Sequence, residues 1–373
     1  MKACPPGCPP AAAIPTEARR TIRARRGRLV FPAAVASAAM AVLPLMSGAA
    51  AATARAAAPS QRLLFVANYG GMGSSGIAAN GSVTVYRVGQ NGNVRALRTI
   101  SKGLSSPQGL AFDRRGDLWV SSSNTNTLVE YTRTALGTRS PAPSVIISAD
   151  SNGSLNGPGG LAFDPVGDLW AANTGVTTVV EYSASQLAKS GSPSPKVTIN
   201  NSNFTTPYGV AFDSTGDLWV ADNDQPSSPA VFEYPKIQLD KASPTPSITL
   251  RIAVSALGDD TRSGLAFDSS GDLWVVNSSG SSLVEFSKSE LAHSSSAPRV
   301  TIGATSDSLN APDGMSIDAA GDLWVANTGS STVVEYTKTE VSRSGSPKPA
   351  VMIAGSATGL NFPMDVVVAP AGG

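Results

Sequence analysis

The sequence Phe-Asp-x-x-Gly-Asp-Leu-Trp-Val recurs along this chain and constrains its fold more than any other feature. Four copies begin with Phe and a fifth begins with Ile, and together they contain all five tryptophans of the protein. The tryptophans follow one another at intervals of 51, 49, 55 and 50 residues, at Trp119, Trp170, Trp219, Trp274 and Trp324. A fixed period of this length indicates a repeat architecture in which each copy forms one supersecondary unit.

One copy of the repeat predicts four antiparallel strands. Apolar and β-branched runs at 160–163, 168–173, 178–182 and 196–199 are separated by turn signals. In the first turn, Asp164 can accept from backbone N–H groups and Gly167 can adopt a positive φ. Residues 183–189 follow a serine cap and predict a short helix. Four such strands form one blade of a β-propeller, and the tryptophan is placed to fill the space between blades.

The two ends of the repeat region each hold part of one blade. Residues 63–68 resemble the tryptophan-containing strand, with Phe65 in place of Trp, and residues 81–86 match the third strand. Residues 361–368 resemble a first strand with nothing after it. We therefore predict an all-β fold over residues 59–373: a six-bladed β-propeller with four antiparallel strands per blade, closed by a split blade that the N- and C-termini share. Closure of this kind removes free sheet edges.

Residues 1–58 differ in composition from the rest of the chain. Six arginines between positions 19 and 28 precede an apolar, Ala-rich run that ends in small residues such as Ala52-Thr53-Ala54. This order is typical of a secretory signal, so we predict a signal peptide with a preceding basic segment and a secreted mature protein. The alternative is an uncleaved membrane anchor, which Pro32, Pro44 and the weak hydrophobicity of Ala disfavour. No later apolar run is long enough for a stable membrane span.

Loss of this segment changes the charge of the protein. The chain has 28 basic and 27 acidic residues, of which the segment holds eight and one, so 20 basic and 26 acidic residues remain. A net negative domain does not attract nucleic acid. Cys4 and Cys8 leave with the segment, so the mature domain is predicted to use neither disulfides nor thiolate chemistry. We expect a monomer.

Most acids of the mature chain belong to the repeat itself. Fifteen of the 26 recur in every full copy, as two turn aspartates and a third-strand glutamate. A feature present in every blade is expected to be structural. In an up-and-down blade, the second-to-third loops and the blade-to-blade loops emerge on the same face. Eight of the eleven remaining acids fall on that rim.

The rim carries a second regularity. Inner strands open with Pro-x-Gly, and x is expected to face the mouth of the central channel; these positions are Gln108, Gly159, Tyr208, Ser263, Asp313 and Met364. Asp365 stands where the sixth blade would have Gly. The second strands end in Asn68, Ser122, Asn173, Asp222, Asn277 and Asn327. Binding residues concentrate in loops at one end of such scaffolds, although the asparagines could instead cap their own turns. The candidate ligand-binding residues are Gln108, Tyr208, Arg262, Asp313 and Asp365.

Histidine-based chemistry is disfavoured. The only histidine, His293, lies in a Ser-rich connection expected on the opposite face. This argues against a Ser-His-Asp triad, a histidine general base and a His-rich zinc site. Calcium asks only for 6–8 oxygen ligands, and Asp313, Asp365 and Asn327 are the residues placed to supply some of them. No other cofactor is predicted.

The per-blade pattern Pro-x-Gly-Leu-Ala-Phe-Asp-x-x-Gly-Asp-Leu-Trp-Val-Ala-Asn, followed by Val-Val-Glu-Tyr, resembles the NHL-repeat family of six-bladed propellers. The resemblance covers nearly the whole mature chain and implies the fold. Relatives with this general architecture include streptogramin lyases, gluconolactonase-like lactonases, peptidyl-amidoglycolate lyases and interaction scaffolds. The lyases rely on histidines that this rim does not offer. Lactonase-like sites use a Glu with Asn and Asp around a metal, and this rim offers no Glu.

Two functions remain open on these grounds. The first is a scaffold that binds an extracellular ligand, whether glycan, peptide, small molecule or protein, at the loop rim. The alternative is a calcium-dependent lactonase or lyase at the channel mouth, with Asp313 and Asp365 as its metal ligands.

Overall fold

The structure is a computed structural model that describes residues 62–370, except 73–77, 80, 203, 223–229, 242–243, 252–263, 293–296 and 307. Every described residue belongs to one compact unit, Ala57–Gly373. Within the described ranges, no helix has the length and apolar character needed to cross a membrane.

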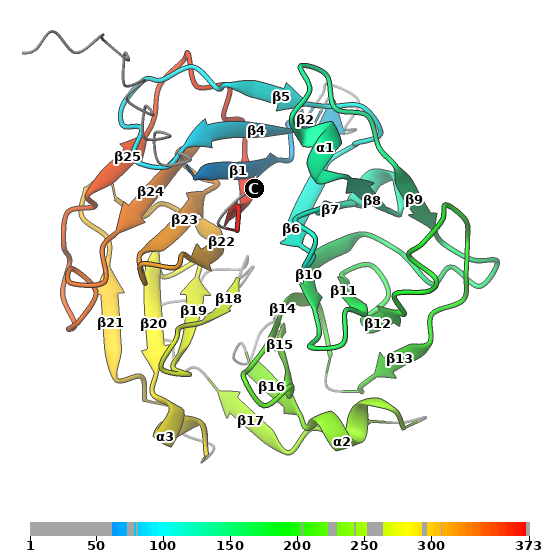
Figure 1. Cartoon of the computed structure of the whole chain (residues 1–373). Helices are drawn as coiled ribbons and strands as arrows, with labels where there is room; N and C mark the ends of the chain where they lie inside the picture. Colours follow the sequence, from blue (N-terminus) through cyan, green and yellow to red (C-terminus); the bar gives the residue numbers. More distant parts are fainter. Residues whose placement is uncertain are drawn as a thin grey trace, which may run out of the picture. The chain divides into compact units, whose positions relative to one another are not determined.

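The described residues form six four-stranded antiparallel sheets arranged in a ring (Figure 1). We number the blades by the chain order of their innermost strands. Blade 1 contains β6 (Pro107–Phe112), β7 (Leu118–Ser122), β8 (Thr127–Tyr131) and β9 (Val145–Ser148). Blade 2 contains β10 (Pro158–Phe163), β11 (Leu169–Asn173), β12 (Thr178–Tyr182) and β13 (Val197–Asn200). Blade 3 contains β14 (Pro207–Phe212), β15 (Leu218–Asp222), β16 (Ala230–Tyr234) and β17 (Ile248–Arg251).

The second half of the ring repeats this order. Blade 4 contains β18 (Leu265–Phe267), β19 (Leu273–Asn277), β20 (Ser282–Phe286) and β21 (Val300–Gly303). Blade 5 contains β22 (Pro312–Ile317), β23 (Leu323–Asn327), β24 (Thr332–Tyr336) and β25 (Val351–Ile353). Blade 6 contains β26 (Pro363–Val368), β1 (Leu63–Asn68), β4 (Ser82–Arg87) and β5 (Arg98–Ile100), and a small hairpin of β2 (Gly71–Met72) and β3 (Ala78–Ala79) leaves it.

Blade 6 joins the two ends of the described chain. β26 pairs antiparallel with β1, so that Phe65 lies opposite Val367 and Leu64 lies opposite Val368. The amide of Ala369 extends the contact by donating to the carbonyl of Leu63 at 2.8 Å. The predicted six-bladed propeller with a split closing blade is therefore confirmed.

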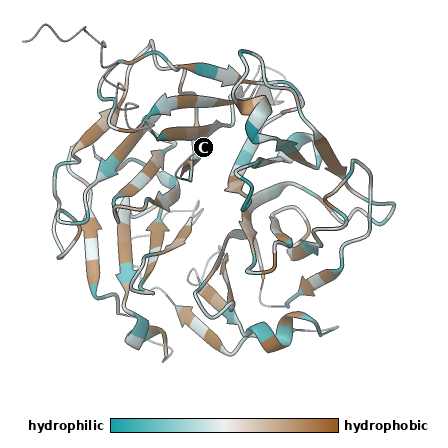
Figure 2. Cartoon of the chain, in the orientation of Figure 1, coloured by the Kyte–Doolittle hydropathy of each residue, from teal (hydrophilic) through white to brown (hydrophobic). Residues whose placement is uncertain are grey.

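The core lies between the blades rather than at the centre of the ring. Six clusters of buried apolar side chains occur, one at each boundary between neighbouring blades. Figure 2 shows apolar residues concentrated in the strands, whereas many outer connections are hydrophilic. At four boundaries an aromatic ring of the second strand packs edge-on against the first-strand Phe of the next blade. The pairs are Phe65–Phe112, Trp119–Phe163, Trp170–Phe212 and Trp219–Phe267, with centroids 5.3–6.4 Å apart.

The recurrent aspartates fix the turns, as their positions predict. In blade 2, one oxygen of Asp164 accepts from the amides of Val166, Gly167 and Asp168. Asp168 in turn accepts from the amide of Ala184 at 2.8 Å, where the chain leaves the third strand. These bonds satisfy backbone donors that the strand ladder leaves over.

The segment predicted as a short helix at 183–189 forms hydrogen-bonded turns instead. Single helical turns occupy the corresponding connection in three other blades: α1 (Arg133–Leu136), α2 (Lys236–Leu239) and α3 (Lys288–Leu291). A connection that holds only one helical turn forms few intrahelical hydrogen bonds. Small differences in local sequence therefore decide whether it becomes a helix or a turn. A 3-10 turn, η1 (Ser123–Thr125), lies at the opposite face of blade 1.

Candidate functional site: the central cavity

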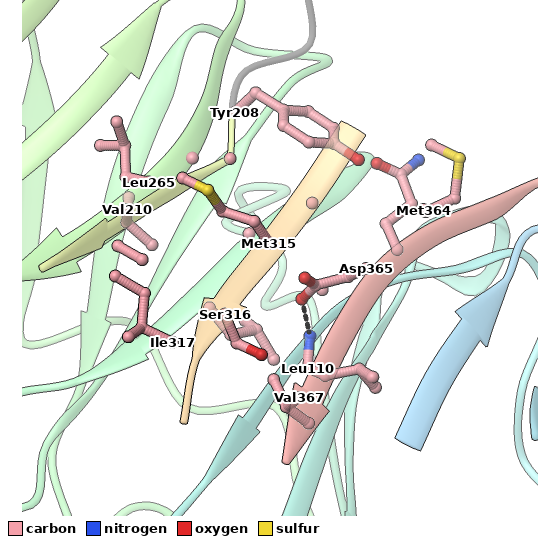
Figure 3. A pocket seen from close by; sticks show the side chains of 18 of the residues that line it. Leu110, Tyr208, Val210, Leu265, Met315, Ser316, Ile317, Met364, Asp365 and Val367 are labelled. Carbon is pink, nitrogen blue, oxygen red and sulfur yellow. Dashed lines mark hydrogen bonds between the residues drawn. The ribbon is translucent and has the colours of Figure 1, made fainter. Parts of the chain in front are cut away.

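A cavity of about 240 Å³ lies where the six innermost strands meet (Figure 3). Every blade contributes to its wall, which is mostly aliphatic. Leu110, Leu161, Val210, Leu265, Met315, Ile317 and Val367 form its apolar surface, together with Ala266 and Phe267. Gln108, Tyr208, Ser316, Met364 and Asp365 bring the polar or polarisable atoms. The described lining residues include no Lys, Arg or His.

The Pro-x-Gly opening of each inner strand places x and Gly next to the channel. In blades 1, 2, 3 and 5 the pairing with the second strand is interrupted between the Pro and the residue that follows the Gly. Such bulges redirect side chains. The Gly itself lets neighbouring blades approach. A Cβ on Gly109 would lie 2.4 Å from the carbonyl oxygen of Gly159, and one on Gly160 would lie 2.5 Å from that of Tyr208.

Asp365 is the exception in this series, because it carries a side chain where the other five blades have Gly. It also stays in the strand ladder, opposite Ala67 of β1. Its carboxyl group extends across the blade boundary towards both neighbours. A Cβ on Gly314 of β22 would lie 2.3 Å from Asp365 Oδ1, so only a glycine leaves room for the carboxyl group there.

The carboxyl group of Asp365 is held by two backbone donors. The amide of Leu110, in β6, donates to Oδ2 at 2.8 Å (Figure 3). The amide of Val366 donates to Oδ1 at 2.8 Å. Burial in the apolar channel raises the pKa of Asp365 to about 8 and outweighs these two bonds, which favour the charged form; nearby Asp313 raises it further. Strongly perturbed carboxyl groups in cavities are candidates for functional groups.

Of the described x positions, Gln108, Tyr208 and Met364 line the cavity, whereas Gly159 and Asp313 do not. Tyr208 is 6% exposed, and its ring fits because Gly159 has no side chain: a Cβ there would lie 3.2 Å from Tyr208 Cδ2. The side-chain oxygen of Gln108 and the hydroxyl of Ser316 are shielded from water and form no hydrogen bond with any described residue. Buried polar atoms in this state are rare, and a bound ligand is one way to satisfy them.

Asp313 lies beside the cavity rather than in its wall. It is 1% exposed, and Thr328 Oγ1 lies 3.5 Å from its Oδ2, a weak contact. The same hydroxyl donates to the carbonyl of Pro363 at 2.8 Å, which links blade 5 to the closing strand.

The asparagine side chains at the ends of the second strands form hydrogen bonds, mainly with backbone groups. Asn327 accepts from the amide of Asn310 at 3.2 Å and donates to Ser308 and Thr332 at 3.0 and 3.1 Å. Asn173 repeats this arrangement in blade 2. These bonds join the end of the second strand to the blade-to-blade loop. The second-to-third loops and the blade-to-blade loops therefore emerge on the same face, as predicted. The bonds also agree with the alternative to ligand binding, in which these asparagine side chains cap turns. Arg262, Ser263 and His293 lie outside the described residues.

The recurrent acids form compact clusters away from the cavity. In four blades, three carboxylates lie within 4.8 Å of one another, for example Asp164, Asp168 and Glu181. Lys196 Nζ contacts this cluster, at 3.0 Å from Asp168 Oδ2 and 2.6 Å from Glu181 Oε1. Burial, reinforced by Asp168, raises the pKa of Glu181 to about 7, although Lys196 opposes the shift. Arg115 and Arg299 contact the equivalent clusters in blades 1 and 4, in line with a structural role.

Ser316 was not among the residues that the sequence singled out. It stands at the fifth position of its inner strand, where blades 1 to 4 have Ala111, Ala162, Ala211 and Ala266. A comparison of this position across the blades identifies it as an outlier, in the same way that Asp365 stands out at the Gly position.

Comparisons with known proteins agree on this class of fold. The sequence profile described as "SMP-30/Gluconolactonase/LRE-like region" matches residues 210–352, which run from β14 to β25. The search of curated proteins gave no match. Among solved structures, the chain is similar to one in a nidogen/laminin complex, with a TM-score of 0.57, 12% identity, and coverage of 83% of this chain and 99% of that one.

Two further structures are similar at the level of the fold. The periplasmic gluconolactonase of Pseudomonas aeruginosa aligns with a TM-score of 0.55 and 18% identity, over 84% of this chain and 87% of that one. A protein of unknown function from Bacteroides caccae aligns with a TM-score of 0.53 and 12% identity, over 83% and 99%. At these identities the likeness defines a six-bladed propeller and no particular activity.

Proposed function

We propose that this protein is a secreted, monomeric propeller whose central cavity binds a small ligand. The observation that carries the proposal is Asp365: at a position where the other five blades have Gly, this chain places a buried carboxyl group in a cavity wall. Desolvation of a carboxyl group opposes folding, so a purely structural ring would favour Gly there too. The basic, apolar and small-residue pattern of residues 1–58 supports export.

The size of the cavity favours a small molecule over a glycan chain or a peptide. A dry cavity of about 150 Å³ can hold a benzene molecule, and pockets for drug-sized ligands begin near 300 Å³. At about 240 Å³, this cavity has room for a ring with a short substituent. Its aliphatic walls suit an apolar body, and Gln108, Ser316 and Asp365 suit a few polar contacts.

A metal-dependent lactonase or lyase is the second candidate, and the profile match over residues 210–352 favours it. The residues do not fit a calcium site well. The side chain of Asn327 is engaged by three backbone or side-chain partners, and Asp313 is not among the described lining residues of the cavity. Two carboxyl groups fall far short of the 6–8 oxygens that calcium takes. The geometry therefore supports the binding protein better.

A fragment screen tests the proposal. Saturation-transfer NMR with a library of ring-containing neutral, cationic and anionic compounds should identify binders to the wild-type protein. Ser316→Phe fills the cavity and should abolish their binding. The matched control is Ser269→Phe, at an exposed turn position where other blades have Arg114, Pro165 and Ser214. Binding that survives Ser316→Phe, in a protein with an unchanged melting temperature, would overturn the proposal.

A further inference from the structure

We propose that the ligand of this cavity is a small organic cation, an ammonium group on an apolar or aromatic body, which pairs with the carboxylate of Asp365. This inference rests on the proposed function and names the chemical class of its ligand. It is carried by three features of the described wall: an acid with no counter-charge among the described residues, acceptor atoms with no donor among them, and an aromatic ring and a thioether at one end.

Asp365 has no cationic partner among the described residues. The strands packed against β26 are β1, β6, β22, β23 and β24. β1, β6 and β23 carry no titratable side chain, and β22 carries Asp313, a second acid. β24 carries Glu335, beside Asp318 and Asp322, and Tyr336, in the core between blades 4 and 5. Among the described residues, none brings positive charge to this carboxyl group, so a cationic guest would complement it.

Two further polar side chains of the wall have oxygen atoms that can accept hydrogen bonds from a ligand. The side-chain oxygen of Gln108 is an acceptor without a partner among the described residues, and the Ser316 hydroxyl has none either. An ammonium group has up to three N–H donors and no acceptor, which suits the side-chain oxygen of Gln108 and the lone pairs of the Ser316 hydroxyl. A carboxylate or phosphate ligand would add acceptors next to two acids.

The body of the ligand follows from the rest of the wall. The ring of Tyr208 and the side chain of Met364 lie at one end of the cavity, and Val367 and Ile317 lie near the other (Figure 3). Aromatic rings attract organic cations through their faces, and thioethers adapt to varied apolar shapes. Aliphatic residues between these ends would enclose a ring or a short chain.

Charge coupling makes the inference testable. The pKa of Asp365 is about 8, so the carboxyl group is mostly protonated at pH 7. A cation binds the ionised form, so binding should release ~0.9 proton at pH 7, from the fraction protonated at that pKa. Affinity should rise by up to about tenfold per pH unit below the pKa and level off about one unit above it, while a neutral ligand shows neither effect.

The probes are benzylamine, benzyl alcohol and benzoate, which share a ring and differ in charge. Calorimetry in two buffers of different ionisation enthalpy gives both the affinity and the protons released. We expect benzylamine to bind at least tenfold more tightly than the other two. Asp365→Asn should remove this preference and the proton release, with benzyl alcohol changed less than twofold. Asp240→Asn, which removes an exposed charge, is the control and should leave all three affinities unchanged.

The outcomes separate this inference from the proposed function. If the three probes bind equally, and Ser316→Phe abolishes all of them, the cavity is a ligand site and the cation inference is wrong. Weaker binding of benzylamine than of benzyl alcohol leads to the same conclusion. If benzylamine binds Ser316→Phe as well as it binds the wild type, the cavity is not the site and the proposed function fails as well.

Discussion

Arg62 Nη2 lies 2.8 Å from Asp318 Oδ2, and this ion pair joins the split blade to blade 5. The Asp318 side chain is completely buried, whereas that of Arg62 is 30% exposed. The other oxygen of Asp318 caps its turn by accepting from the amides of Ala320 and Asp322. Arg62 lies directly before β1, which pairs with β26 to close the ring, and its charge neutralises Asp318 of the neighbouring blade.

Replacement of Arg62 by Ala should destabilise the protein by about 1–3 kcal/mol, because it leaves the buried Asp318 carboxylate without its cation. Urea denaturation followed by tryptophan fluorescence measures the effect. The double variant Arg62→Met with Asp318→Asn should recover part of the loss, since both charges are then removed. Equal stability of the wild type and Arg62→Ala would show that the pair contributes nothing to closure.

Truncation after Leu360 removes β26 and should abolish cooperative unfolding, or produce aggregation, because β1 then becomes an open apolar edge. The control is truncation after Pro370, which keeps every pair of the β1–β26 ladder. Differential scanning calorimetry distinguishes the two proteins. A shortened protein with the melting temperature of the full chain would contradict a role for the shared blade in stability.

Trp170 and Trp274 occupy equivalent positions but meet different neighbours. Trp170 packs edge-on against Phe212 with ring centroids 5.9 Å apart, whereas Trp274 belongs to a cluster against which Ile317, a residue without a ring, is packed. Substitution of either by Leu should cost about 2–4 kcal/mol through lost burial and packing. The loss at Trp170 should exceed that at Trp274 by about 0.5–1.5 kcal/mol, the contribution of an aromatic pair. Chemical denaturation measures the loss of stability in both variants, and a larger loss at Trp274 than at Trp170 would contradict the prediction.

Asp365 should make stability depend on pH. Its folded-state pKa of about 8 lies above the unfolded value of 3.8, so the folded protein retains a proton that the unfolded chain releases. Its contribution to stability is therefore greatest at acidic pH and is lost as pH rises from about 4 to about 8. The unfolding free energy of the wild type relative to Asp365→Asn should fall by at most about 1.4 kcal/mol per pH unit across this window. A flat difference would refute the raised pKa.

Calcium should have no specific effect on stability. Millimolar calcium is expected to leave the melting temperature of the wild type within error of that in chelator, and Asp313→Ala should behave in the same way. An increase of several degrees that disappears in Asp313→Ala would instead support the metal-dependent enzyme, because ligand binding to the native state raises its stability.

The fold could be predicted from the sequence because each blade repeats the same local signals. The tryptophan, the turn aspartates and the glycine mark strand and turn positions five times over, and Phe65 and Met364 fit the same template at the ends of the chain. The Arg62–Asp318 pair could not be predicted in this way. Arg62 lies outside the repeat, and its partner is close only after the ring has closed.

The site was predictable in part, through departures from the template. Gln108, Tyr208 and Asp365 differ from their counterparts in other blades, and all three line the cavity. Ser316 differs in the same sense from the alanines at its position, but its exposure to the channel becomes evident only from strand geometry. The role of Asn327 was ambiguous, because one of its partners, the amide of Asn310, lies 17 residues earlier, in the blade-to-blade loop.

The pairing of Leu64 with Val368 has a consequence for biogenesis. While the polypeptide is being made, the first strand of the ring must wait for the last, with its apolar edge uncovered throughout elongation. A chaperone that holds the nascent chain, or passage through a translocation pore before folding, would cover that interval. Refolding in vitro should accordingly be limited by a late step that depends on protein concentration. In this step, strands of other molecules compete with the C-terminal strand of the same chain for the edge of β1.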